Sequence, residues 1–106
     1  MRTLKLLNLH CNKIDDNNTK VDETFLTVDN GNFQGFGPES MRNGSDWNIN
    51  ATIQFNVEAI VSFYDEDLIG NYFSSHIVEE NEVLKGPKKV SFTSNNANYI
   101  LTYEIV

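Results

Sequence analysis

A chain of 106 residues is long enough for one domain and too short to bury two separate cores. Its hydrophobic fraction of 40% and charged fraction of 22% argue against a disordered or fibrous chain. Fifteen acidic against eight basic side chains give a formal net charge of −7, which argues against nucleic-acid binding through a broad basic surface and favours cations as ligands. We expect one soluble domain over residues 1–106.

The amino terminus and the single cysteine limit the classes of protein to which the chain could belong. Charged residues interrupt the apolar residues of 1–9 too often for a signal-peptide core, and no apolar run approaches a membrane span in length. Cys11 is the only cysteine, which excludes an internal disulfide and a cysteine-rich zinc site. We expect a buried structural thiol. The compartment stays open, because one cysteine suits a reducing cytosol and does not forbid export.

The first half of the chain predicts three strands. Residues 3–11 carry leucines on both faces of an alternating pattern, which is typical of an inner strand. The Asn- and Asp-rich stretch 12–22 predicts a long loop. Strands at 23–29 and 33–36 are then joined by a hairpin at Asn30-Gly31, where both residues tolerate positive φ.

Glycine and proline near residues 35–38 predict the end of the third strand, and 39–44 predicts either a short helical turn or a loop. A clean period of two then marks a half-buried antiparallel strand whose inward face is Trp47, Ile49, Ala51, Ile53 and Phe55.

Four further strands complete the pattern. The alternation resumes at 59–63, and three more strands are expected at 75–79, 88–93 and 98–105. The aromatic residues of these segments fit the core or one sheet face: Trp47, Phe55, Phe63, Tyr99 and Tyr103. Eight short strands with minimal helix predict an all-β sandwich or barrel.

Catalytic motifs find no support in the sequence. It contains no phosphate-binding glycine loop, no zinc-protease helix motif and no nucleophile elbow, so we expect no enzymatic activity. His10 and His76 could meet a carboxylate and hold a metal, but isolated strand histidines are more often structural.

The acidic residues collect in two places, each at the end of a predicted strand. One group lies in the first loop and the other follows residue 64: Asp15, Asp16, Asp22, Asp65, Glu66 and Asp67. Calcium takes six to eight oxygen ligands, and alternate residues of an extended segment can turn both carboxylates toward one ion. The segment beginning at Asp65 is not an EF-hand, because Ile69 and His76 occupy its fifth and twelfth positions, which need oxygen ligands.

These two acidic stretches resemble the calcium loops of C2 domains. Residues 60–67 end in Asp65-Glu66-Asp67, as the later calcium loop of that family follows a strand that ends in Asp-x-Asp. Asp16 and Asp22, with 22–28 entering a strand, resemble the first calcium loop. The resemblance covers most of the chain in strand order. It implies an eight-stranded antiparallel β-sandwich whose acidic loops share calcium at one end.

The ligands implied by the resemblance are carboxylates of both loops, namely Asp15 or Asp16, Asp22, Asp65 and Asp67, with backbone carbonyls of Tyr64 or Glu66 adding oxygens. The family usually has a further Asp after the pair, whereas this chain has Asn71 there, so we expect one calcium site. The alternative is a solvated acidic surface, since Asp also favours turns.

The sequence therefore leads to two functional hypotheses. The first is a non-catalytic calcium-binding module that presents a calcium-ordered loop surface to an unidentified protein or lipid partner. The second is a calcium-independent interaction domain of the same fold, such as an adaptor, an inhibitor or a carbohydrate-binding module. In some C2 domains apolar loop tips enter membranes, but core packing is favoured here for Leu68, Ile69, Tyr72 and Phe73. The sequence predicts no oligomeric state.

Overall fold

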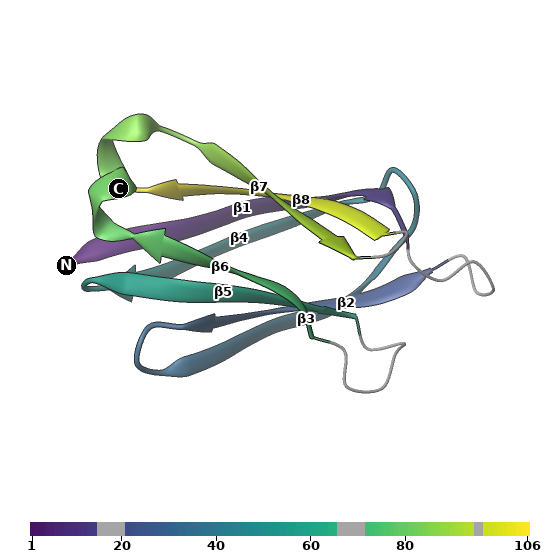
Figure 1. Cartoon of the computed structure of the whole chain (residues 1–106), viewed down its shortest axis with the longest axis horizontal. Coiled ribbons are helices and arrows are strands. Elements are labelled where there is room, and N and C mark those ends of the chain that lie inside the picture. The colour runs from purple at the N-terminus through teal and green to yellow at the C-terminus, as the bar shows by residue number, and fades with distance from the viewer. Residues whose placement is uncertain (15–20, 66–71, 95–96) are drawn as a thin grey trace.

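Two four-stranded antiparallel sheets pack face to face in the computed structural model, which describes residues 1–14, 21–65, 72–94 and 97–106 (Figure 1). Sheet A has the strand order β4-β1-β8-β7, and sheet B has the order β3-β2-β5-β6. The strands are β1 (Arg2–Lys13), β2 (Asp22–Asp29), β3 (Phe33–Met41), β4 (Asp46–Phe55), β5 (Glu58–Asp65), β6 (Tyr72–Glu79), β7 (Lys88–Ser94) and β8 (Ala97–Ile105). The predicted eight-stranded sandwich is confirmed, and the barrel alternative is not.

Strand β1 keeps most of its apolar side chains on one face through a β-bulge. Leu4 and Leu6 face the core, and so do Leu9 and Cys11, although the two pairs differ in parity along the strand. Pairing with both β4 and β8 shifts register directly after Leu6, and the extra residue restores the inward direction. The predicted inner strand is confirmed. Leu7, at the register shift, is half-buried and lies outside the core cluster, so one apolar residue of β1 does not join this face.

Strand β3 is longer than the sequence predicts. The expected end near residues 35–38 and the helical turn at 39–44 are wrong, since the strand continues to Met41, and only 42–45 form a connection. Two features allow the continuation. Pro38 lies on an edge strand, where a missing N–H costs no inner ladder bond. Gly37 has a φ of +103° and approaches the Thr24 carbonyl so closely that a Cβ would lie 2.8 Å from its oxygen.

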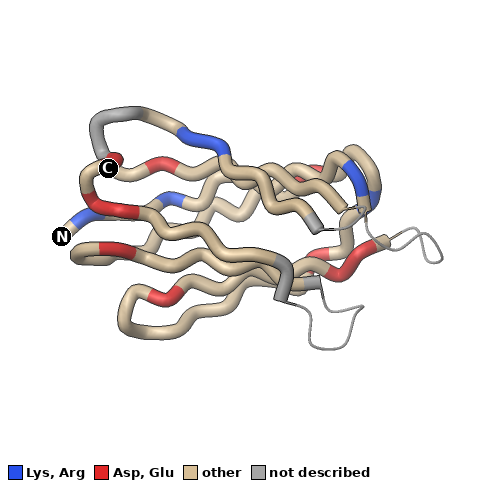
Figure 2. The backbone as a smooth tube through the Cα atoms, in the orientation of Figure 1, with Lys and Arg blue, Asp and Glu red and all other residues tan. Residues whose placement is uncertain are grey.

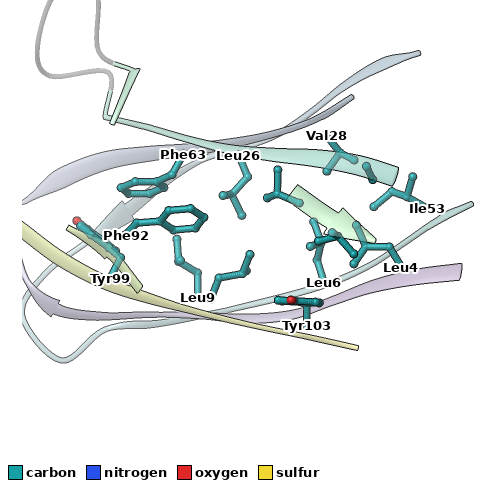
Figure 3. Close-up of a cluster of buried hydrophobic side chains, with 14 of the residues drawn as sticks. Leu4, Leu6, Leu9, Leu26, Val28, Ile53, Phe63, Phe92, Tyr99 and Tyr103 are labelled. Carbon is teal, nitrogen blue, oxygen red and sulfur yellow. The ribbon is translucent and has the colours of Figure 1, made fainter. Parts of the chain in front are cut away.

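The hydrophobic core fills the space between the two sheets (Figure 3). Phe63 of sheet B stacks on Phe92 with ring centroids 5.5 Å apart and contacts Tyr99 at 4.6 Å, so aromatic contacts join the sheets. Burial of each such side chain contributes about 1.5–3 kcal/mol to stability. The predicted core aromatics are confirmed, with Trp47 only half-buried at the margin.

The two ends of the sandwich differ in their connections. At the end that we call the loop end, β1, β3, β5 and β7 finish and β2, β4, β6 and β8 begin. Connection 42–45 is tied there to β1, because the Gly44 backbone N–H donates to the Cys11 carbonyl at 2.7 Å. Both termini lie at the opposite end, the far end (Figure 1). There a 3₁₀ helix, η1 (Glu80–Lys85), joins β6 to β7, an element that the sequence analysis missed.

Candidate metal site

Asp22 carries a fully buried carboxylate at the loop end. It is the first residue of β2 and shares the inward face of that strand with Thr24 and Leu26, all of them 0% exposed. Tyr99, near the start of β8 in the opposite sheet, donates its hydroxyl to Asp22 Oδ2 at 2.6 Å. One hydrogen bond therefore joins the two sheets directly behind the loop end.

The electrostatics around Asp22 keep its neighbours protonated. The pKa of Tyr99 is raised, first by burial and then by its hydrogen bond to the Asp22 carboxylate and the charge of that group. Burial also raises the pKa of the Cys11 thiol, hydrogen bonding with Tyr99 opposes this shift, and the charge of Asp22 adds to it. At neutral pH the phenol remains a donor, and Cys11 remains a buried thiol, as predicted.

The second predicted acidic stretch begins on the strand beside β2. Asp65 is the last residue of β5, and its Cα pairs with that of Thr24, two residues along β2 from Asp22. The strand ends that carry Asp22 and Asp65 are therefore neighbours in sheet B. Asp15, Asp16 and Asp67 lie outside the described residues, as do Glu66 and Asn71.

A metal cluster is not present within the part of the chain that the structure describes. No group of three or more His, Cys, Asp or Glu side chains there could hold an ion. Within the same residues, no helix is both long enough and apolar enough to cross a bilayer. The calcium ligand set therefore stays a prediction, of which the structure describes the Asp22 carboxylate in full.

Comparison with solved structures identifies the fold. The chain superposes on a C2 domain with a TM-score of 0.63 and 12% identity over 99% of this chain and 98% of that one. A C2 domain of plant extended synaptotagmin 1 gives a TM-score of 0.62 and 11% identity over 98% and 92% of the two chains. This chain has the C2 fold. No protein-family model matches the sequence, and no curated protein matches it.

A third likeness, to human GIVD cytosolic phospholipase A2, concerns a small part of that enzyme. The TM-score is 0.56 at 16% identity, and the match covers 98% of this chain but 17% of the phospholipase chain. Because so little of the enzyme aligns, the likeness shows the C2 fold and carries no inference of phospholipase activity.

The carboxylate of Asp22 fits a calcium ion chemically. Calcium prefers hard oxygen ligands, and an ionised carboxylate offers about four lone-pair sites, so a hydrogen bond from Tyr99 to Oδ2 is compatible with coordination. An anion in the protein interior is costly unless positive charge or donors compensate it. The Tyr99 hydroxyl is one such donor, and a cation bound at the loop end would add to this compensation.

Both histidines have side-chain partners. His10 Nδ1 lies 2.8 Å from Asp46 Oδ1 on the outer face of sheet A. His76 Nε2 lies 3.0 Å from the hydroxyl of Tyr103, which donates its own proton to Glu82. Because that hydroxyl has one proton, His76 must donate to it through Nε2. These partners agree with the structural interpretation of both histidines.

At the far end, Glu82 of η1 is the centre of a network that the sequence analysis missed. Its Oε1 accepts from Tyr103 at 2.7 Å and from the Lys88 ammonium at 3.0 Å, and its Oε2 accepts from the Glu79 backbone N–H at 2.7 Å. Burial would raise the pKa of Glu82, but these donors and the charge of Lys88 outweigh it, and the pKa is lowered. A signal was available, since a buried tyrosine usually finds a hydrogen-bond partner.

Proposed function

We propose that this C2 fold is a non-catalytic module that binds one calcium ion at the loop end and presents a calcium-ordered loop surface to a protein or lipid partner. The proposed ligands are the carboxylates predicted from the sequence, Asp22, Asp65 and Asp67, with Asp16 or Asp15. The observation that supports the proposal best is the fully buried carboxylate of Asp22, beside the strand end at which the second acidic stretch begins.

The proposed ligands differ in how rigidly the fold holds them. Asp22 is fixed by Tyr99 on a rigid strand, so it would provide a preorganised ligand. The other proposed carboxylates follow β1 or end β5 in the sequence, and their mutual repulsion opposes their approach. Bound calcium supplies the positive charge that removes this repulsion. The loops would then adopt the arrangement that a partner recognises.

Thermal unfolding in millimolar calcium and in excess chelator tests the proposal. A ligand that binds only the folded state stabilises it by RT ln(1 + [L]/Kd), about 2.7 kcal/mol at a hundredfold excess over Kd. A shift of the unfolding midpoint of several degrees is expected for a domain of this size. An unchanged midpoint at millimolar calcium would contradict calcium binding.

Paired variants locate the site. Asp65→Asn and Asp67→Asn should each remove most of the calcium-induced shift, since a neutral amide is a weaker calcium ligand than a carboxylate. Glu58→Gln is the matched control, because it removes one exposed charge at the far end of the same strand as Asp65. If the control loses the shift equally, the effect comes from net charge and the proposed site is wrong.

The calcium-independent interaction domain remains the second candidate, and one observation favours it. The hydrogen bond from Tyr99 gives Asp22 a structural role that requires no metal. Under this hypothesis Asp22→Asn changes stability equally in calcium and in chelator. Under the calcium hypothesis the same variant also loses the part of the stability that depends on calcium. Sedimentation with anionic vesicles, with and without calcium, then distinguishes a lipid partner from a protein partner.

A further inference from the structure

The charges of the molecule are divided between its two sheets. In the strands of sheet B, as the structure describes them, there is no Lys or Arg, and the acidic residues are Asp22, Glu23, Asp29, Glu39, Glu58, Asp65 and Glu79. In the strands of sheet A the basic residues are Arg2, Lys5, Lys13, Lys88 and Lys89, against the acidic Asp46 and Glu104. Figure 2 shows this separation. The net charge of −7 is therefore not spread evenly over the surface.

The far-end half of the outer face of sheet B combines these charges with exposed apolar side chains. We call it the acidic face, and it consists of Asp29, Glu58, Glu79, Phe33, Ile60 and Ile77. The strand register places these residues on one face, because Ile60 pairs with both Asp29 and Ile77, and Asp29 also pairs with Phe33. Phe33 is 69% and Ile77 50% exposed.

Two carboxylates of the acidic face lie directly opposite each other. Glu58 pairs with Glu79 across β5 and β6, and both side chains are exposed. Such neighbours have Cβ atoms about 4.5–5.5 Å apart, and like charges there destabilise a sheet. An external positive charge would relieve this repulsion. Among the described residues, no group of three or more His, Cys, Asp or Glu side chains on this face could hold a metal ion.

An open cavity of about 280 Å³ borders the acidic face. Asp29 and Glu58 line it together with the apolar side chains of Val57 and Ile60. Carboxylates beside aliphatic walls suit a lysine or arginine side chain, whose apolar stem covers aliphatic surface while its charged head meets the acids. The cavity therefore offers an anchor point for one basic residue.

We propose that the acidic face binds a basic, partly apolar segment of a partner protein, with a Lys or Arg side chain in the cavity between Asp29 and Glu58. Charge complementarity selects this partner, because an anionic lipid surface or nucleic acid would be repelled by the same carboxylates. Phe33, Ile60 and Ile77 provide the apolar contacts. The surface lies at the far end of the sandwich, so this inference is independent of the calcium proposal.

The test uses fluorescence anisotropy of a labelled peptide of repeated Lys-Leu units in low salt with chelator present. Binding is expected for this peptide and not for its Glu-Leu counterpart. The double variant Asp29→Asn, Glu58→Gln should bind about fivefold or more weakly, since each substitution removes a charge and keeps the side-chain shape. Amide chemical shifts of the ¹⁵N-labelled chain should change at Ile60 and Ile77.

A matched control separates the acidic face from net charge. The double variant Asp46→Asn, Glu104→Gln removes two charges from sheet A and should bind the peptide as the unchanged chain does. Equal weakening in both double variants would overturn the proposal, and so would shifts confined to sheet A. Concentration-dependent dimerisation that needs Asp29 and Glu58 would also overturn it, because the occupant would then be a second copy of this chain. Circular dichroism checks that every variant is folded.

Discussion

Strand β8 places a tyrosine hydroxyl on an acidic side chain near each end of the sandwich. Tyr99 donates to Asp22 at the loop end, and Tyr103 donates to Glu82 at the far end. The two tyrosines are four residues apart and face the core together, with exposed fractions of 0% and 2%. Similar bonds thus connect β8 to the first residue of β2 at one end and to η1 at the other.

The surroundings of the two carboxylates differ in a way that separates a structural acid from a candidate ligand. Glu82 is only partly buried, and a lysine ammonium and a backbone N–H compensate its charge within the chain. Asp22 is fully buried, beside strand ends where the sequence continues into further aspartates. At the far end the acid, Glu82, joins η1 to β7 and β8 through hydrogen bonds. At the loop end the buried acid is the one that we propose as a ligand of an external cation.

The largest expected effect comes from Tyr99→Phe. Loss of the hydroxyl removes a donor from a fully buried carboxylate, which should lower the free energy of unfolding by about 2 kcal/mol in chelator. Urea denaturation measures the change. Tyr103→Phe is the matched control, and it should cost about 1 kcal/mol, because Glu82 keeps Lys88 and the Glu79 N–H. Equal losses of unfolding free energy in the two variants would contradict the distinction between the two ends of the sandwich.

A smaller effect is expected for Glu82→Gln. The amide keeps the size of the side chain but loses the charge that strengthens its bonds to Lys88 and Tyr103, so stability should fall by about 1 kcal/mol at neutral pH. Glu39→Gln on an exposed edge-strand position is the control and should change little. A loss in the control as large as in Glu82→Gln would show that the network contributes nothing specific.

Most of the fold could be predicted from the sequence because apolar and polar residues alternate clearly in its strands. Residues 47–55 give the inward face of β4 directly. The errors fall where tertiary context overrides a local pattern. A bulge after Leu6 reverses the parity of β1, and an edge position lets β3 continue past Pro38. Neither the partner strand nor the edge position is visible in a single segment of sequence.

The candidate site could be predicted only in part. The position of Asp22 at the start of a predicted strand makes it a candidate ligand. Its burial and its hydrogen bond to Tyr99 depend on a contact between residues that are 77 positions apart in the sequence. The cross-strand pair Glu58 and Glu79 depends likewise on register. Spacing along the chain identifies which acids lie near strand ends. It does not identify which acid receives a donor from the opposite sheet.

The smallest expected effect is the pH dependence of the Glu82 network. Its carboxyl pKa is lower when folded than the ordinary value of 4.5, so it stabilises the fold above that value and loses this contribution as the pH falls through the folded pKa. The stability gap between the unchanged chain and Glu82→Gln should therefore narrow below about pH 4.5, because the Lys88 ammonium keeps its charge in acid and adds no opposing change. Urea denaturation at about pH 6 and near pH 3 measures the gap. A gap that widens in acid would mean that Glu82 is stabilised in its protonated form, which would contradict this prediction.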